Sequence, residues 1–148
     1  MSEGAFQEDC VAAHNKYRRL HGVPELSLSE ELATSAQMWA DRIVERGYLQ
    51  NSDNVLFGEN ILLAVEDVSG EEVADLWYNE EENYDYEQSR WNRDCRHFTQ
   101  MVWKSCTDIG VGKARMRDDG KFVIVIHYKP CGNNNGRGEF KKNVVPKI

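Results

Sequence analysis

At residues 122–128 the chain reads Phe-Val-Ile-Val-Ile-His-Tyr, and this stretch decides the fold. Its five successive apolar side chains, 122–126, indicate a strand covered on both faces, because a strand with one solvated face alternates apolar and polar residues. The preceding Asp118-Asp119-Gly120 is a turn signal of the kind that joins hairpin strands. We therefore expect 122–128 to pair antiparallel with 109–116.

Amphipathic patterns before this hairpin supply the helices that must cover it. Apolar residues recur at spacings of three and four in 6–20, 28–43 and 73–84. The side chains expected to face inward are Phe6, Cys10, Ala13, Tyr17 and Leu20; Leu28, Leu32, Ala36, Trp39 and Ile43; and Val73, Leu76, Trp77, Glu80 and Tyr84. With helices before the strands, the sequence predicts an α+β fold, a three-layer α-β-α sandwich around a mostly antiparallel sheet.

Capping patterns place the helix starts. Ser27-x-x-Glu30 and Ser69-x-x-Glu72 both have the capping-box spacing, so helices are expected to begin there. Residues 97–104 can form a further short helix. The aperiodic, polar stretch 48–59 and the aromatic-bearing stretch 86–95 are expected to be loops.

Length and charge narrow the class of protein. A chain of 148 residues matches one domain, spanning 1–148. The net charge of −7 disfavours a nucleic-acid partner, because phosphate binding needs a basic surface. No run approaches the roughly 20 apolar residues of a membrane span, and the first five residues lack the pattern of a secretory signal. A secreted protein with its signal removed would look the same, so these features leave the compartment open.

The four cysteines leave the redox compartment open. Cys10, Cys95, Cys106 and Cys131 fit no paired C-x-x-C zinc pattern. Cys10 lies on an apolar helical stripe, where a buried free thiol is expected. The other three could hold a disulfide or none.

Glu80 is the most informative single residue. A carboxylate on an apolar helix face is costly unless it is paired or meets water. Glu59 and His97 are candidate partners, although their spacing alone does not bring them together. A satisfied structural role is the alternative to a functional one.

Several blocks resemble the signatures of the CAP superfamily, which comprises cysteine-rich secretory proteins, antigen 5 and pathogenesis-related proteins. The two longest are Arg96-His97-Phe98-Thr99-Gln100-Met101-Val102-Trp103 and His127-Tyr128-Lys129-Pro130-Cys131-Gly132-Asn133-Asn134. Residues 13–18, 58–60 and 77–80 are similar to further blocks in the same order. The resemblance covers about 6–146, and 138–146 is most similar to the Golgi-associated branch, which has no signal peptide.

The resemblance implies a central cleft that holds two His and two Glu and in several members binds zinc or another divalent cation. Glu59, Glu80 and His97 match three of these positions, while Asn51 stands where the fourth, a His, is expected. Because an Asn amide poorly replaces imidazole on zinc, we predict weak or absent zinc binding and no required cofactor. Two carboxylates and one imidazole could still hold Mg²⁺ or Ca²⁺ loosely.

The resemblance also bears on the cysteines. Val111 and Ile126 stand where secreted relatives commonly carry disulfide cysteines. The absence of cysteines at these two positions favours the Golgi-associated branch and a reducing compartment. The resemblance therefore implies an intracellular protein, cytoplasmic or associated with Golgi membranes; an extracellular protein whose signal peptide has been removed is the alternative.

The function that the resemblance favours is a non-enzymatic binding module for a lipid or sterol, or for a protein partner. Tyr84, Tyr86 and Trp91 lie where some members bind sterols, although they could equally cover the third helix. Members of the Golgi-associated branch attach to anionic membranes and self-associate, so peripheral membrane contact and a homodimer are further expectations. Because the net charge of −7 argues against purely electrostatic attachment, membrane contact would need the basic tail 137–148 or apolar contacts.

Two other functions remain open. The first is a metal-assisted hydrolase with Glu80 or Glu59 as general base and His97 as acid or ion ligand. The second is a secreted defence or venom allergen-like protein. His14 and His127 are expected to be structural.

Overall fold

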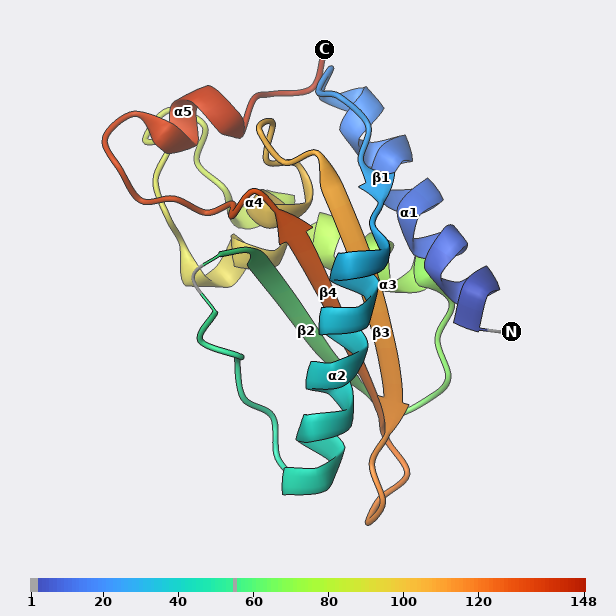
Figure 1. Ribbon diagram of the computed structural model, residues 1–148. Helices are drawn as coiled ribbons and strands as arrows, with labels where there is room; N and C mark the ends of the chain where they lie inside the picture. Colours follow the sequence, from blue (N-terminus) through green and yellow to red (C-terminus); the bar gives the residue numbers. More distant parts are fainter. Residues whose placement is uncertain (1–2, 55) are drawn as a thin grey trace.

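The fold is a four-stranded sheet with helices on both faces (Figure 1). The computed structural model describes residues 3–54 and 56–148. Its elements are α1 (Glu3–Leu20), β1 (Ser27–Leu28), α2 (Glu30–Arg46), β2 (Gly58–Ala64), α3 (Gly70–Tyr78), the 3-10 helices η1 (Asn79–Asn83) and η2 (Arg93–Cys95), α4 (Arg96–Met101), β3 (Asp108–Arg115), β4 (Phe122–Lys129) and α5 (Glu139–Asn143).

Strand β4 lies inside the sheet, whose order is β1-β3-β4-β2. It pairs antiparallel with β3 and with β2, while the short β1 pairs parallel with β3. Val123, Ile124, Val125 and Ile126 are fully buried, as expected for a strand covered on both faces. The hairpin and the mostly antiparallel sheet are therefore confirmed. Strand β2 was not expected, and Gly58 and Glu59, assigned from the sequence to a loop, belong to it.

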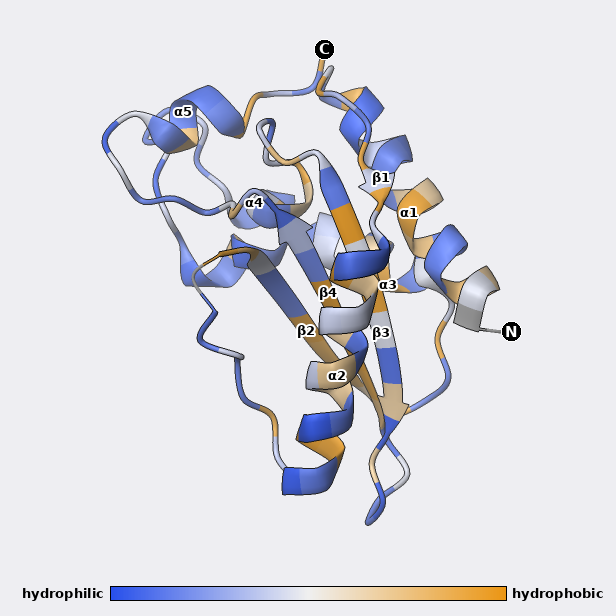
Figure 2. Ribbon diagram, viewed as in Figure 1, coloured by the Kyte–Doolittle hydropathy of each residue, from blue (hydrophilic) through white to orange (hydrophobic). Residues whose placement is uncertain are grey.

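The two faces of the sheet carry separate cores. Ala36, Ala40 and Ile43 of α2 pack with Val123 and Val125 on one face. On the other face α1, α3 and α4 contribute residues such as Phe6, Trp77 and Phe98, which cluster with Ile124 and Ile126. Figure 2 shows apolar residues along the strands and on one side of the helices. This arrangement confirms the α-β-α sandwich.

Helix α2 rests directly on the backbone of β3, at Gly110 and Gly112. A Cβ atom on Gly110 would lie 2.1 Å from the Ala33 backbone nitrogen, and one on Gly112 would lie 2.4 Å from that of Gln37. Real Cβ atoms do not approach backbone so closely. The two glycines therefore fix how near α2 lies to the sheet.

One of the two expected helix starts is wrong. Helix α2 begins at Glu30 with Ser29 as its N-cap, whose hydroxyl accepts from the Leu32 amide, whereas Ser27 belongs to β1. Ser69 and Glu72 form the expected capping box of α3. Three side chains expected to face inward are exposed, because Leu20 ends α1, Leu28 lies in β1, and α3 buries the opposite side from Leu76.

Two buried polar side chains of α1 hold the layers together. His14 is the hydrogen-bonded core histidine that was expected, with its ring nitrogens 2.8 Å from the Cys10 carbonyl and 2.7 Å from the Tyr128 hydroxyl. Arg18 is fully buried, and its guanidinium donates to the carbonyl oxygens of Pro24, Met101, Trp103 and Cys106 at 2.7–3.1 Å. It thereby ties α1 to the segment that follows α4.

All four cysteines are free thiols, and Cys10 is buried as expected. Burial raises the pKa of Cys10 and of Cys106 to about 12 and that of Cys95 to about 11. Cys131 is exposed. Among the described residues, no helix is long and apolar enough to cross a membrane.

We expect Arg18→Ala to lower the free energy of unfolding, measured by urea denaturation, by about 3 kcal/mol or more, because it leaves buried carbonyls without their donor. Arg19→Ala is the matched control. Arg19 pairs with Glu25 on the exposed surface, so its loss should cost less than about 1 kcal/mol. Equal losses in the two variants would contradict the anchoring role of Arg18.

We also expect one thiol of the folded protein to react rapidly with Ellman's reagent at pH 8, and four after denaturation. Burial raises the pKa of all four thiols, but only Cys131 is exposed and accessible to the reagent, whereas the other three sulfurs are buried. Cys131→Ser should abolish the rapid phase. A second rapid thiol in the native protein would contradict the buried positions.

Candidate functional site

Glu80 and His97 meet directly. Glu80, in η1, places Oε2 2.8 Å from Nδ1 of His97, and its Oε1 accepts from the backbone amides of His97 and Phe98 at 3.1 and 3.2 Å. The His97 ring stacks on Trp77, with the ring centroids 5.3 Å apart. The partner that a carboxylate on this face requires is therefore an imidazole and two amides from the start of α4.

Glu59 forms a second carboxylate–imidazole pair, with His127. The two residues face each other across β2 and β4, and Glu59 Oε2 lies 2.7 Å from His127 Nε2. Glu59 Oε1 accepts from the Ser52 backbone amide at 2.8 Å and from the Asn51 side-chain amide at 3.1 Å. Burial raises the pKa of Glu59, but the hydrogen bonds from His127 and Ser52 outweigh it, so its pKa lies below the usual 4.5.

The two pairs approach opposite faces of the sheet near the start of β2. His127 reaches Ser35 of α2, so Glu59 and His127 lie on the α2 face. Asn60 points the other way, as alternation along a strand requires, and its amide donates to the His97 carbonyl at 3.1 Å. The two pairs therefore contact neighbouring residues of β2, Glu59 and Asn60, from opposite faces of the sheet.

The described side chains do not form a metal centre. Within residues 3–54 and 56–148, no group of three or more His, Cys, Asp or Glu is arranged to hold an ion. Each carboxylate of the expected set instead bonds an imidazole and backbone amides. The gathering of Asn51, Glu59, Glu80 and His97 in one cleft stays a prediction, as does weak zinc binding.

His127 has a position that the sequence analysis did not anticipate. Its ring is buried, and Nδ1 lies 2.7 Å from the Ser35 hydroxyl while Nε2 faces Glu59. The only signal for this contact is the register of β2 against β4, which sets Glu59 opposite His127. Because no strand was expected there and Glu59 was assigned to a loop, that signal could not be used.

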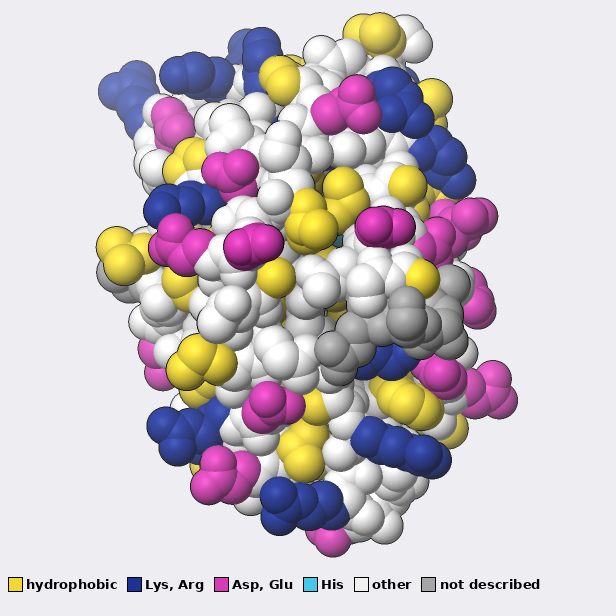
Figure 3. Space-filling model, turned by 45° about the vertical axis from the view of Figure 1, so that its right-hand side comes forward, with side chains coloured by type: hydrophobic (Ala, Val, Ile, Leu, Met, Phe, Trp, Pro, Cys, Tyr) yellow, Lys and Arg dark blue, Asp and Glu magenta, His cyan; other side chains and the backbone are white. Residues whose placement is uncertain are grey.

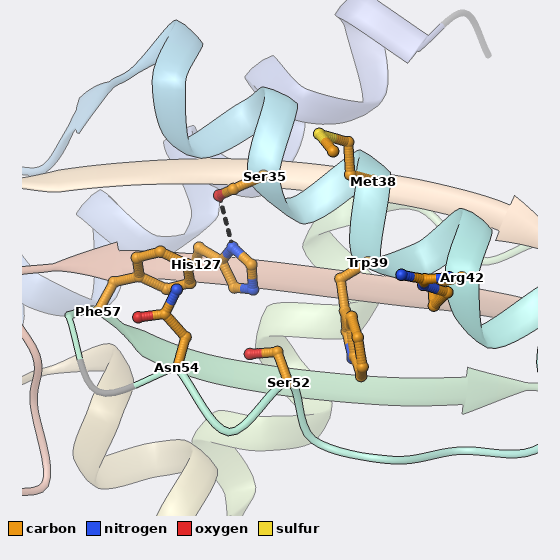
Figure 4. A pocket seen from close by; sticks show the side chains of 8 residues that line it. All are labelled: Ser35, Met38, Trp39, Arg42, Ser52, Asn54, Phe57 and His127. Atoms are coloured by element: carbon orange, nitrogen blue, oxygen red, sulfur yellow. Dashed lines mark hydrogen bonds between the residues drawn. The ribbon is translucent and has the colours of Figure 1, made fainter.

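A cavity of about 290 Å³ opens beside His127, between α2 and the segment before β2 (Figure 4). Its lining residues are Ser35, Met38, Trp39, Arg42, Ser52, Asn54, Phe57 and His127. Met38, Trp39 and Phe57 make its walls largely apolar, and Arg42 supplies an exposed positive charge. The Trp39 indole donates to the Gln50 carbonyl at 2.7 Å and so ties the loop to the helix.

The cavity contrasts with the outer surface that Figure 3 shows, where apolar side chains form small patches between charged ones. The aromatic residues expected to line a groove lie elsewhere. Tyr84 is buried and packs edge-on against Tyr86, whose hydroxyl donates to Glu81 at 2.6 Å. Trp91 is 43% exposed. Ligand binding by these three residues stays a prediction.

Together, the sandwich and its signature blocks define a small α-β-α protein in which two carboxylate–imidazole pairs flank the start of one strand. Residues 11–128 match the cysteine-rich secretory protein family, known as CAP, and the chain belongs to this family.

Relatives from distant organisms align over most of the chain. Golgi-associated plant pathogenesis-related protein 1 of Homo sapiens is 40% identical over 144 residues, covering 95% of this chain and 93% of the relative. Pathogenesis-related protein 1 of Arabidopsis thaliana is 35% identical, covering 86% and 78%. Among solved structures, venom allergen-like protein 4 of Schistosoma mansoni superposes with a TM-score of 0.69 at 26% identity, covering 90% and 92%.

We expect Glu59→Gln to lower the free energy of unfolding by about 1–3 kcal/mol at pH 7, because the variant loses a charge-assisted partner for His127 and Ser52. The folded-state pKa of Glu59 lies below 4.5, so the stabilisation is present above that pH and is lost as the pH falls through the folded-state value. The difference between the two proteins should therefore shrink in acid. Glu45→Gln, at an exposed position of α2, should leave the free energy of unfolding unchanged at pH 7 and in acid. If the loss caused by Glu59→Gln were the same at every pH, the lowered pKa of Glu59 would be contradicted.

Proposed function

We propose that this chain is a binding module that holds a lipid in the cavity beneath α2. The observation that carries the proposal is an apolar cavity of about 290 Å³ with one cationic side chain, Arg42, among its lining residues. Ligand pockets are typically concave and mostly apolar, with a few polar groups that orient the ligand. An amphiphile with a hydrocarbon body and an anionic head has the matching chemistry.

The size of the cavity favours an acyl chain over a whole sterol. Its volume lies at the lower end of the range of roughly 300–1,000 Å³ for ligand pockets, so a rigid sterol would enter by one end only. A flexible chain can follow the space between Met38, Trp39 and Phe57, with its carboxylate at Arg42. Asn54 and Ser52 offer further hydrogen bonds to the head group.

Location and partners are part of the same proposal. We place the protein inside the cell, at the cytoplasmic face of a membrane such as that of the Golgi, because the human relative is named Golgi-associated and all four thiols here are free. Lys141 and Lys142, in the exposed last turn of α5, would contact anionic lipids. A second copy of the chain or another protein would bind it at the membrane surface. None of this requires a metal or a cofactor.

The test is isothermal titration of the protein with dodecanoate below its micellar concentration, and separately with cholesterol sulfate. We expect saturable one-to-one binding of dodecanoate. Arg42→Gln should weaken it about fivefold, the effect of roughly 1 kcal/mol from one exposed charge pair. Met38→Glu, at a position that is 67% exposed, should weaken it further by placing a negative charge beside the carboxylate.

Arg19→Gln is the matched control, because it removes the same charge from an exposed position on α1, outside the cavity lining. Its affinity should equal that of the unmodified protein. No binding of dodecanoate, or equal binding by all variants, would overturn the proposal. Tighter binding of cholesterol sulfate than of dodecanoate would overturn the preference for an acyl chain.

A further inference from the structure

Ser35, His127 and Glu59 form one continuous hydrogen-bonded chain at the wall of the cavity. The Ser35 hydroxyl lies 2.7 Å from His127 Nδ1, and His127 Nε2 lies 2.7 Å from Glu59 Oε2. Figure 4 shows the first of these contacts, with Ser35 reaching down from α2 to the imidazole on β4. The three residues are far apart in sequence, so no local motif announces them.

The surroundings of His127 determine which of its two ring nitrogens can accept a proton from Ser35. The side chains of His127 and Glu59 are 1% and 8% exposed, which shields both groups from water. Glu59 is held as a carboxylate by His127, by the Ser52 backbone amide and by Asn51. A carboxylate at Nε2 keeps the proton of a neutral imidazole on that nitrogen, so Nδ1 is left to accept a proton from Ser35.

A hydroxyl beside a basic nitrogen that is oriented by a carboxylate is the arrangement that activates serine as a nucleophile. The roles depend on geometry rather than on chain order, and here the two imidazole nitrogens exchange the places they hold in serine proteases. The Ser35 hydroxyl also lies 3.0 Å from the Leu32 carbonyl, to which it can donate. Its proton must turn from that carbonyl to Nδ1 before attack.

We propose that Ser35 is an acylatable nucleophile that cleaves carboxylic esters of medium-chain acyl groups, with His127 as its general base and Glu59 as the residue that positions His127. This proposal rests on the same cavity as the proposed lipid site, but the acyl chain would lie along Met38, Trp39 and Phe57 with its ester carbonyl at Ser35 rather than with a carboxylate at Arg42. The Asn54 amide and the Ser52 hydroxyl, which also line the cavity, are the donors available to an oxyanion.

The reaction balances without an oxidant or a cofactor. Ser35 Oγ attacks the ester carbonyl carbon while its proton passes to His127 Nδ1; the bond to the alcohol oxygen then breaks, and that oxygen takes the proton from His127. Water attacks the acyl-serine in the same way, giving one proton to His127, which returns it to Ser35 Oγ as the acid leaves. The sum is ester plus water to acid plus alcohol.

The experiment uses p-nitrophenyl octanoate and a fluorophosphonate probe on the whole chain. We expect release of nitrophenolate with a burst approaching one equivalent, and peptide mapping should place both the octanoyl and the phosphonyl adduct on Ser35. Ser35→Ala should show neither. Thr34→Ala, which removes an exposed hydroxyl of α2 outside the cavity lining, should keep the adduct on Ser35.

His127→Gln keeps hydrogen-bonding capacity but loses the base, so the acylation rate should fall about 100-fold or more. A purely structural role for His127 would leave that rate unchanged in variants whose urea midpoint shows that they fold. The adduct map of the unmodified protein does not depend on any variant folding.

Several outcomes would overturn the proposal: no adduct in the unmodified protein, an adduct on another residue that persists in Ser35→Ala, or equal rates with and without His127. Binding of dodecanoate without any adduct would sink the nucleophile and leave the lipid site standing. An adduct on Ser35 without dodecanoate binding would do the reverse.

Discussion

The close contact of α2 with β3 is the constraint on which the rest of the molecule depends. The helix backbone can lie against the strand only because Gly110 and Gly112 have no side chains, since a Cβ atom at either position would overlap the backbone of α2. That short separation brings Ser35 within hydrogen-bonding distance of His127 on the neighbouring strand. It also sets the depth of the cavity, whose other wall is the segment before β2. A helix seated further out would leave the imidazole without its second partner.

Burial of charge is handled in two different ways on the two sides of the sheet. On the α1 side, Arg18 is a cation surrounded by carbonyl oxygens, so its hydrogen bonds join segments without a countercharge. Burial lowers its pKa only to about 10, and the group stays charged at neutral pH. On the α2 side, the Glu59 carboxylate is hydrogen-bonded to the His127 imidazole. The first arrangement surrounds one cation with neutral acceptors, whereas the second sets a carboxylate against an imidazole, which is the pair that the proposed Ser35 nucleophile uses.

The sequence predicted the layers well and the site only in part. The apolar run 122–126 and the helical stripes were sufficient for the sandwich, because burial on both faces of a strand leaves a direct pattern in the residues. Glu80 was identifiable because a carboxylate on an apolar stripe needs a partner, and His97 is that partner. Ser35 and His127 had no such pattern. Serine is ordinary on a helix, and a histidine in a covered strand is ordinary in a core, so their meaning depends on a strand register that no local signal supplied.

The same register explains what replaces the histidine expected at position 51. Asn51 still donates to Glu59, but through an amide that is neither an acid nor a base at neutral pH. An imidazole nevertheless reaches Glu59, from His127 across the sheet, and its second nitrogen is already engaged by Ser35. A metal ion needs a free nitrogen lone pair, whereas a proton relay needs both nitrogens bonded at once. With the imidazole on the strand rather than in the loop, both of its nitrogens are hydrogen-bonded, which is the arrangement that the proposed proton relay uses.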